Sequence, residues 1–289
     1  MNRLDRRDFL LQSLAAGAAA WAAPAALAEE AKDVQGMRLG LVTYLWGESW
    51  DLPTVIANCE KAKILGVELR TEHKHGVEPR LSAAERAEVK KRFADSAVTF
   101  VGPGTNECYD SPDAARLTKS IETTKAFIKL SHDCGGSGVK VKPNDFHKEV
   151  PHDKTIAQIA ESLNTIGKFA ADYGQEIRLE VHGSCGAVPV IKQIMDQVEA
   201  KNVGACWNCN GDELKSGGLA QNFNLLRPRF GHTAHVRELN LDDYPYGELI
   251  GLFVRSKYAG WILLECRTKP ADVLAALSEQ REVFLRMLG

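Results

Sequence analysis

The strongest constraint on the fold of this chain is the regular alternation of strand-like and helix-like segments over residues 39–288. Short segments rich in Val, Ile and Leu alternate with longer stretches in which apolar residues recur at helical spacing. Alternating β and α elements are typical of a parallel sheet covered by helices. Eight strand-like segments are found, and they begin at Leu39, Gly66, Ala97, Gly138, Ile177, Val203, Thr233 and Trp261.

The number of these units and the chain length distinguish between a closed and an open sheet. Eight units within residues 29–289 fit a closed (β/α)8 barrel, for which about 250 residues are typical. An open doubly wound sheet would typically carry a Gly-x-Gly-x-x-Gly loop after its first strand, but the sequence there is LVTYLWGESW. We therefore predict the α/β class, with a single (β/α)8 barrel domain over residues 29–289.

The first 28 residues have the composition of an export signal. Arg6 and Arg7 precede an Ala- and Leu-rich run, which ends in the small-x-small sequence Ala26-Leu27-Ala28. The paired arginines followed by Asp-Phe-Leu resemble a twin-arginine signal. We expect cleavage after Ala28 and a periplasmic or secreted protein that is exported in the folded state.

Composition excludes some classes of partner. A formal net charge of −2 and a pI of about 6.5 provide no basic surface, so we expect no nucleic-acid partner. Beyond the signal, no segment reaches the roughly 18 charge-free apolar residues of a membrane span, so we expect no membrane association after cleavage. The sequence leaves the oligomeric state open.

Charged side chains occupy one face of several predicted strands. In RLEVHG, Leu179 and Val181 fall on one face, whereas Arg178, Glu180 and His182 fall on the other. Desolvating charges without a function rarely stabilises a protein, so a repeated pattern of this kind indicates a site inside the barrel. The other polar residues on the same predicted face or in the adjoining loop are Glu68, Arg70, His75, Lys140, Lys142, Asn208, Asn210, His235, Arg237, Glu265 and Arg267.

Three of these residues have the chemistry of metal ligands. Glu180, His235 and Glu265 lie near the ends of three different strands, where side chains of a barrel converge. Two carboxylates and an imidazole are suitable ligands for Mn²⁺, Mg²⁺, Co²⁺ or Zn²⁺. The same two carboxylates can exchange a proton at a carbon beside a carbonyl. We expect a fourth ligand from the sixth strand.

The chain resembles the xylose isomerase-like superfamily of TIM barrels, which contains sugar isomerases and epimerases. The resemblance rests on GVELR, on EVHG at Glu180, CWNCN at Asn208, HVREL at His235 and LLECR at Glu265. It implies a divalent metal held by Glu180, His235 and Glu265, with the two glutamates as the catalytic acid and base. The family's aspartate ligand is replaced by Asn208, and Asn210 shares its parity, so the sequence leaves open which asparagine faces the site.

The remaining polar residues predict the substrate. We expect Glu68, Arg70, His75, Lys140, Lys142, Arg178, His182, Asn210, Arg237 and Arg267 to contact a small sugar. The excess of cations suits an acidic or oxidised sugar, although the same cations could instead hold the glutamates in place. Alternatives to an isomerase are a lyase or hydratase on keto-glycosides and a carbohydrate-binding barrel without catalysis. Phosphodiester cleavage is the weakest alternative, because the chain lacks a basic face.

Overall fold

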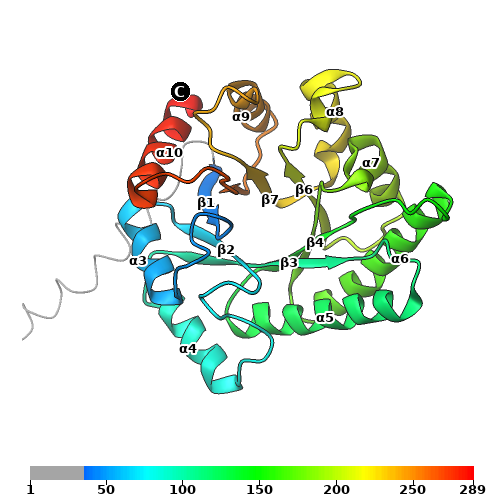
Figure 1. Cartoon of the computed structure of the whole chain (residues 1–289), viewed down its shortest axis with the longest axis horizontal. Helices are drawn as coiled ribbons and strands as arrows, with labels where there is room; N and C mark the ends of the chain where they lie inside the picture. The colour runs from blue at the N-terminus through cyan, green and yellow to red at the C-terminus, as the bar shows by residue number, and fades with distance from the viewer. Residues whose placement is uncertain (1–35) are drawn as a thin grey trace, which may run out of the picture.

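A computed structural model describes residues 36–289 and shows a closed barrel of eight parallel strands (Figure 1). The predicted signal segment lies outside the described residues. Each strand pairs with its neighbours in sequence, and β1 pairs with β8 to close the ring. This architecture confirms the predicted (β/α)8 barrel. The strands are β1 Arg38–Val42, β2 Gly66–Arg70, β3 Thr99–Cys108, β4 Gly138–Lys142, β5 Glu176–Glu180, β6 Val203–Asn208, β7 Phe230–Val236 and β8 Trp261–Leu264.

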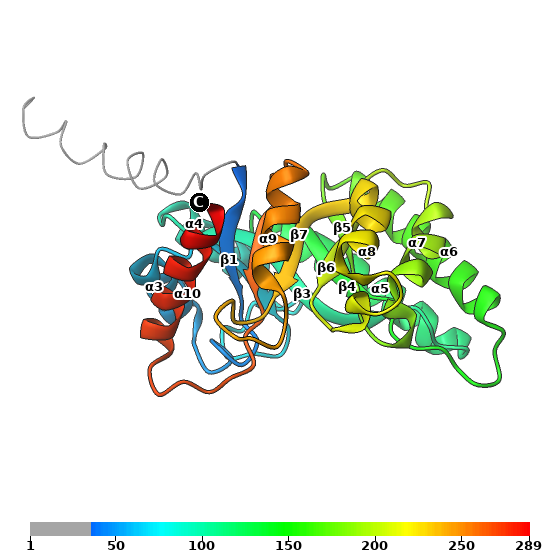
Figure 2. The same ribbon diagram turned by 90° about the horizontal axis from the view of Figure 1, so that it is seen from above.

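A helix follows every strand and packs on the outside of the barrel (Figures 1 and 2). Side-chain caps define several helix starts: Asp51 accepts from the Thr54 amide, and Ser82 with Glu85 forms a capping box. The last helix lies beside the first and completes the outer ring. The helices are α3 Leu52–Ala62, α4 Ala83–Ala94, α5 Ala114–Asp133, α6 His152–Ala171, α7 Val188–Asp196, α8 Gly218–Leu226, α9 Tyr246–Arg255 and α10 Val273–Leu288.

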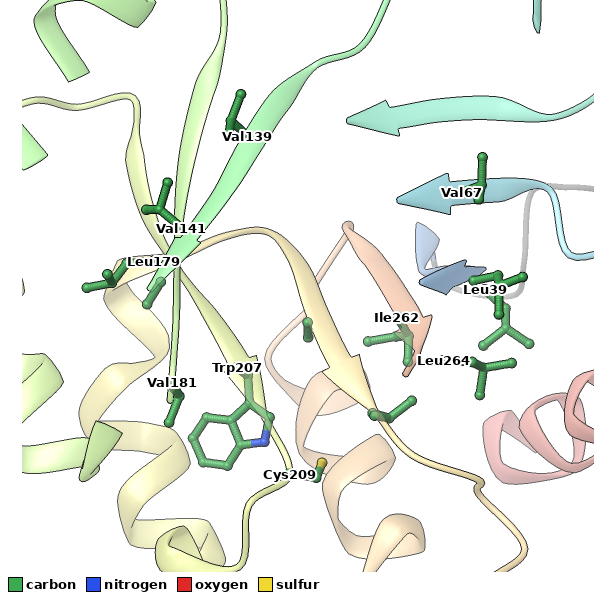
Figure 3. Packing of buried hydrophobic residues seen from close by; sticks show 14 of the residues in the cluster. Leu39, Val67, Val139, Val141, Leu179, Val181, Trp207, Cys209, Ile262 and Leu264 are labelled. Atoms are coloured by element: carbon green, nitrogen blue, oxygen red, sulfur yellow. The ribbon is translucent and has the colours of Figure 1, made fainter. Parts of the chain in front are cut away.

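The main hydrophobic core lies between the strands and the surrounding helices. Val67, Val139, Leu179 and Leu264 project outward from their strands into this layer, as Figure 3 shows. A separate small cluster of Val42, Val101, Trp261 and Leu263 forms the apolar part of the other strand face. The strand parity deduced from the sequence is therefore correct, and the charged residues of the same strands occupy the barrel interior.

Strand β3 is longer than the segment Ala97–Gly102 that the sequence suggested. It continues through Pro103 and Gly104 to Cys108, although Gly and Pro usually interrupt strands. Close packing explains the two glycines: a Cβ on Gly102 would lie 2.0 Å from the Gly138 carbonyl oxygen, and one on Gly104 would lie 2.4 Å from Glu68 Oε1. The glycines thus create space inside the barrel. Among residues 36–289, no helix is long and apolar enough to cross a bilayer.

Candidate active site

The carboxyl ends of β5, β7 and β8 bring together three potential metal ligands. Glu180 is the last residue of β5, His235 is the penultimate residue of β7, and Glu265 directly follows β8. One ligand atom from each of these buried side chains lies within 4.8 Å of the others. Strand parity and the common direction of parallel strands therefore produce the cluster that the sequence predicted.

The carboxylate of Glu68, on β2, holds the imidazole ring of His235 in place. The two Glu68 oxygens lie 3.3 and 3.4 Å from Nε2 of His235, and both side chains are fully buried. Gly104 leaves the space for this carboxylate. The opposite ring nitrogen, Nδ1, lies 3.9 Å from Glu180 Oε1 and has no hydrogen-bond partner among the described residues. A carboxylate on one imidazole nitrogen with the other nitrogen free is the usual support of a metal-binding histidine.

Glu180 is bound on both of its oxygens. Lys140 Nζ lies 2.7 Å from Oε2, and Asn208 Nδ2 donates to Oε1 at 2.6 Å. Burial alone would raise the pKa of Glu180, but the positive charges of Lys140 and His235 outweigh burial and hold it well below its usual value. Glu180 is therefore an anion at neutral pH. Lys140 also donates to the Thr105 carbonyl at 3.1 Å, which fixes the ammonium inside the barrel.

The two asparagines of β6 and the loop after it differ in their roles. Asn208 is buried and contacts Glu180, whereas the exposed Asn210 donates to the Val181 carbonyl at 2.5 Å. Asn208 is therefore the asparagine that faces the cluster. Because a carboxylate can only accept, Asn208 presents its amide nitrogen to Glu180 and keeps its carbonyl oxygen as the possible ligand atom.

Two predicted substrate contacts, Lys142 and His182, lie around this cluster at the carboxyl ends of β4 and β5. Lys142 is half-buried, and burial together with repulsion from Lys140 lowers its pKa to about 8. Its ammonium also interacts electrostatically with Glu180, Glu265 and Arg70. Burial lowers the pKa of His182, against the opposing charge of Glu180. Lys142 therefore supplies positive charge beside the two carboxylates near pH 7, whereas His182 is neutral there.

The three predicted arginine contacts at the mouth are held loosely. Arg70 lies over the Tyr44 ring with its guanidinium 5.5 Å from the ring centre. Arg237 lies 3.8 Å from Asp243, and the exposed Arg267 lies 4.0 Å from Glu265. Only distant partners hold these side chains, so they remain available to a ligand.

The structure places Arg178 away from the site, at the amino-terminal end of the barrel. Its guanidinium donates to Glu176 at 2.7 Å, the Val101 carbonyl at 2.9 Å and Ser137 Oγ at 2.8 Å. A Cβ on Gly138 would lie 2.8 Å from the guanidinium carbon, so this glycine provides the room for that conformation. Strand parity assigned Arg178 to the interior correctly, but parity does not reveal towards which end a long side chain turns.

His75 is also not positioned as the sequence suggested. Its Nε2 lies 2.7 Å from the Arg70 carbonyl, and its Nδ1 accepts from the Val77 amide at 3.0 Å. Burial lowers its pKa to about 4, so the ring is neutral and both nitrogens serve to shape the loop after β2. Glu68, similarly, supports His235 and is fully buried, so it does not face a substrate.

Sequence reasoning missed Gly104, Asn106 and His73. Gly104 makes room for Glu68, and Asn106 accepts from Lys142 Nζ at 3.1 Å. His73, in the same loop as His75, has a buried Nδ1 without a partner among the described residues, and burial followed by the charge of Arg70 lowers its pKa. Residues 73–76, HKHG, carry two histidines in this loop, and the sequence does not indicate which of them stays free.

The donor set is compatible with a divalent cation. Two carboxylates, one amide oxygen and one imidazole nitrogen form the mixed oxygen and nitrogen set that Mn²⁺, Co²⁺ and Zn²⁺ accept. The unpartnered Nδ1 of buried His235, oriented by Glu68, fits such an ion. One feature is unusual for a simple metal site. Lys140 neutralises the charge of Glu180, and Asn208 donates to its other oxygen, without any cation being bound.

Solved structures of other proteins share this fold. A 3-keto-D-glucoside 4-epimerase from E. coli is 14% identical with a TM-score of 0.70, covering 86% of this chain and 99% of that one. An L-ribulose 3-epimerase is 16% identical with a TM-score of 0.74, covering 87% and 94% of the two chains. The IOLI protein, crystallised with a zinc atom, is 13% identical with a TM-score of 0.72, covering 86% and 97%.

Comparison of sequences gives the family. A search of curated proteins finds no match. Residues 56–210, more than half of the chain, match the model of the family described as xylose isomerase-like TIM barrel. Together with the closed eight-stranded barrel, this match shows that the chain belongs to the xylose isomerase-like TIM barrel family.

Proposed function

We propose that this protein is a sugar isomerase or epimerase that moves a proton at a carbon beside a carbonyl, assisted by a divalent cation. The observation that carries the proposal is the convergence of Glu180, His235 and Glu265 within 4.8 Å at the carboxyl end of the barrel. Enzymes with this fold carry their chemistry at that end. The similar structures include two sugar epimerases and a zinc-containing protein, which supports the same reading.

The cation would be held by Glu180, Asn208, His235 and Glu265. When bound, a divalent ion polarises a carbonyl and stabilises the negative charge that develops on its oxygen. Which of Mn²⁺, Mg²⁺, Co²⁺ or Zn²⁺ serves in this role is part of the proposal to be tested. Glu68 would keep Nδ1 of His235 pointing at the ion, because it engages the opposite nitrogen.

The two glutamates have different surroundings, which assigns them different roles. Among residues 36–289, Glu265 has one ion-pair partner, Arg267, at 4.0 Å, so its carboxylate is free to accept a proton. Glu180 is paired with Lys140 and Asn208, so once protonated it is a strong acid that returns the proton readily. We therefore propose Glu265 as the base that takes the proton from the carbon. Glu180 would pick up a proton from solvent and deliver it to the opposite face of that carbon, after which Glu265 returns its proton to solvent. Lys140 keeps Glu180 ionised between turnovers.

The mouth favours a small sugar that carries an acidic or oxidised group. The cations at the mouth are Lys142, Arg70, Arg237 and Arg267. Two of them, Arg237 and Arg267, have ion-pair partners only at 3.8 and 4.0 Å, and the other two have no ion-pair partner among residues 36–289. A planar guanidinium binds a carboxylate or a polarised carbonyl through two parallel hydrogen bonds. The remaining predicted contact, His182, lies beside Glu180 on β5 and would meet the sugar hydroxyls.

Export through the twin-arginine route is part of the same proposal. It rests on Arg6, Arg7 and the Ala-rich run that ends at Ala28. A protein carrying a bound metal benefits from folding before it crosses a membrane. Sequencing of the mature protein from the periplasm or medium should give Glu29 as the first residue, and replacing both arginines with lysine should stop export. A mature protein that begins at Met1 would contradict the proposal.

Solvent exchange tests the reaction most directly. We expect the protein, supplied with Mn²⁺ or Co²⁺, to incorporate deuterium from D₂O beside the carbonyl of a ketose or keto-sugar and to form its epimer. Glu265→Gln should reduce the rate by about a hundredfold or more, which is the usual contribution of a positioned base. NMR of the products measures both effects.

A matched control separates chemistry from folding. Glu161→Gln, an exposed glutamate on α6, should leave the exchange rate unchanged. Retention of exchange in Glu265→Gln would contradict the role of Glu265. Loss of water or of an aglycone instead of epimer formation would assign the protein to the lyases or hydratases.

A further inference from the structure

A second cavity lies beside the mouth of the barrel. It has a volume of about 470 Å³ and is formed by the end of β3, one face of α5 and the loop after β4. Arg116, Lys119, Ser120 and Thr123 share that face of α5, as their helical spacing requires. The volume falls in the range of about 300–1,000 Å³ that is typical of small-molecule sites.

A side-chain hydrogen bond connects this cavity to the proposed active site. Lys142 Nζ donates to Oδ1 of Asn106, which lines the cavity, at 3.1 Å. Lys142 also interacts with Glu180 and Glu265. Lys142 therefore lies between the two carboxylates and the cavity.

Hydrogen bonds hold the floor of the cavity in shape without a ligand. Gln158 on α6 donates to the carbonyls of Tyr109 at 2.7 Å and Ser111 at 2.9 Å. Buried Asp110 pairs with His147 at 3.0 Å and accepts from the Asp145 amide at 3.2 Å. The cavity is therefore preformed, which lowers the entropic cost of binding.

Most of the residues that line the cavity are polar, and their charges are close to balanced. Glu107 and Asp110 supply negative charge, and Arg116 and Lys119 supply positive charge. Asn106, Ser120, Thr123 and Asn144 add neutral donors and acceptors. Such a wall suits a neutral group that both donates and accepts hydrogen bonds at many points, as a sugar ring does.

We propose that this cavity is a second sugar subsite, so that the substrate is a glycoside whose oxidised ring lies at Glu180 and Glu265 while its second ring occupies the cavity. This inference rests on the proposed function, because it extends the same substrate. It names the substrate class as a disaccharide-like keto-glycoside in place of a free monosaccharide.

Equilibrium binding tests the subsite. In the Glu265→Gln background, which prevents turnover, we would measure the Kd of 3-keto-maltose and of methyl 3-keto-α-glucoside by calorimetry. These probes share the oxidised ring, and only the first has a second ring. We expect 3-keto-maltose to bind about tenfold more tightly, which corresponds to one or two net hydrogen bonds.

Filling the cavity should remove this preference. Thr123→Trp places a bulky ring in the cavity and should equalise the two Kd values without weakening binding of the methyl glycoside. The matched control is Thr165→Trp, which alters a separate surface cavity of about 400 Å³ on α6 and should preserve the tenfold difference. If Thr123→Trp folds poorly, Glu107→Gln is a milder alternative. We expect it to reduce the preference for 3-keto-maltose only in part.

The outcomes separate the subsite from the proposed reaction. Three results would overturn the subsite. They are equal Kd values for the two probes in the Glu265→Gln variant, a preference that survives Thr123→Trp, and no binding of either probe. If the preference follows the expected pattern but the unsubstituted enzyme turns over neither probe, the subsite stands and the proposed reaction fails. Turnover of both probes without a binding preference would retain the reaction and overturn the subsite.

Discussion

The two ends of the barrel interior both contain buried charges, but the two sets of charges differ in how completely they are hydrogen-bonded. At the amino-terminal end, the guanidinium of Arg178 makes three hydrogen bonds, to Glu176, Val101 and Ser137. At the carboxyl-terminal end, Nδ1 of His235 has no partner among the described residues and Glu265 has only Arg267 at 4.0 Å. Strand β5 contributes to both ends, through Arg178 and Glu180.

This difference distinguishes a structural network from a candidate active site. A buried polar group without a partner carries a large energetic cost, so complete hydrogen bonding is what a purely structural network requires. Incomplete hydrogen bonding at the other end indicates groups that await a ligand. The comparison predicts that substitutions at the amino-terminal end change stability and those at the carboxyl-terminal end change binding and turnover.

The largest effect on stability is expected from Arg178→Met. Removing the guanidinium leaves Glu176 with only the exposed His232 as an ion-pair partner, and it takes the donors from the Val101 carbonyl and from Ser137, so we expect a loss of about 3 kcal/mol in the free energy of unfolding. Activity per folded molecule should stay within about twofold, because no atom of Arg178 reaches the mouth. Urea denaturation and kinetics at 15 °C measure the two quantities. A large fall in kcat of folded protein would place Arg178 in the active site after all.

Asn208→Asp should strengthen metal binding by about tenfold or more, because it adds a negative charge to the ligand set. Without metal, the new carboxylate faces Glu180 across the present 2.6 Å contact, so the melting temperature should fall and Mn²⁺ should restore it. Titration calorimetry and thermal melts provide the readouts. Asn210→Asp is the control: it replaces the donor to the Val181 carbonyl with a carboxylate, so the melting temperature should fall, but metal affinity should not rise and Mn²⁺ should not restore the melting temperature. Equal responses of the two variants would contradict the assignment of Asn208.

A smaller effect is expected from the titration of Lys142. Its pKa is lowered to about 8 by burial and by Lys140, so it is charged below that pH and loses its charge as the pH rises through 8. Because a charged lysine attracts an acidic sugar, KM for such a substrate should rise by about threefold between pH 7 and 9. Lys142→Met should abolish this pH dependence, whereas the exposed Lys148→Met should retain it. An unchanged pH profile in Lys142→Met would remove Lys142 from the substrate site.

The sequence predicted the barrel because hydrophobic periodicity determines both the element type and the face that each strand buries. The same parity assigned Glu180, His235 and Glu265 to the interior, and the parallel direction of the strands brought them together. Parity could not show that Arg178 turns towards the opposite end, because that choice depends on space at Gly138.

Loop and strand-end residues were predicted less well for a related reason. His75 is engaged by the backbone of its own loop, and the distinction between Asn208 and Asn210 depends on where β6 ends. The contact between Lys140 and Glu180 joins neighbouring strands and follows from the register of β4 against β5, which a sequence does not display. Local pattern therefore identified which residues are interior, and three-dimensional packing decided their partners.

The metal content of the purified protein tests the central claim most directly. The protein would be prepared without chelator and incubated with Mn²⁺, Co²⁺ or Zn²⁺, beside a variant carrying His235→Gln and Glu265→Gln. The account predicts about one divalent ion per wild-type chain and none in the variant. Absence of metal from the wild type after all three incubations would contradict it, and would mean that Lys140 and Asn208 satisfy Glu180 so fully that the carboxyl-terminal end is, like the other, a closed network.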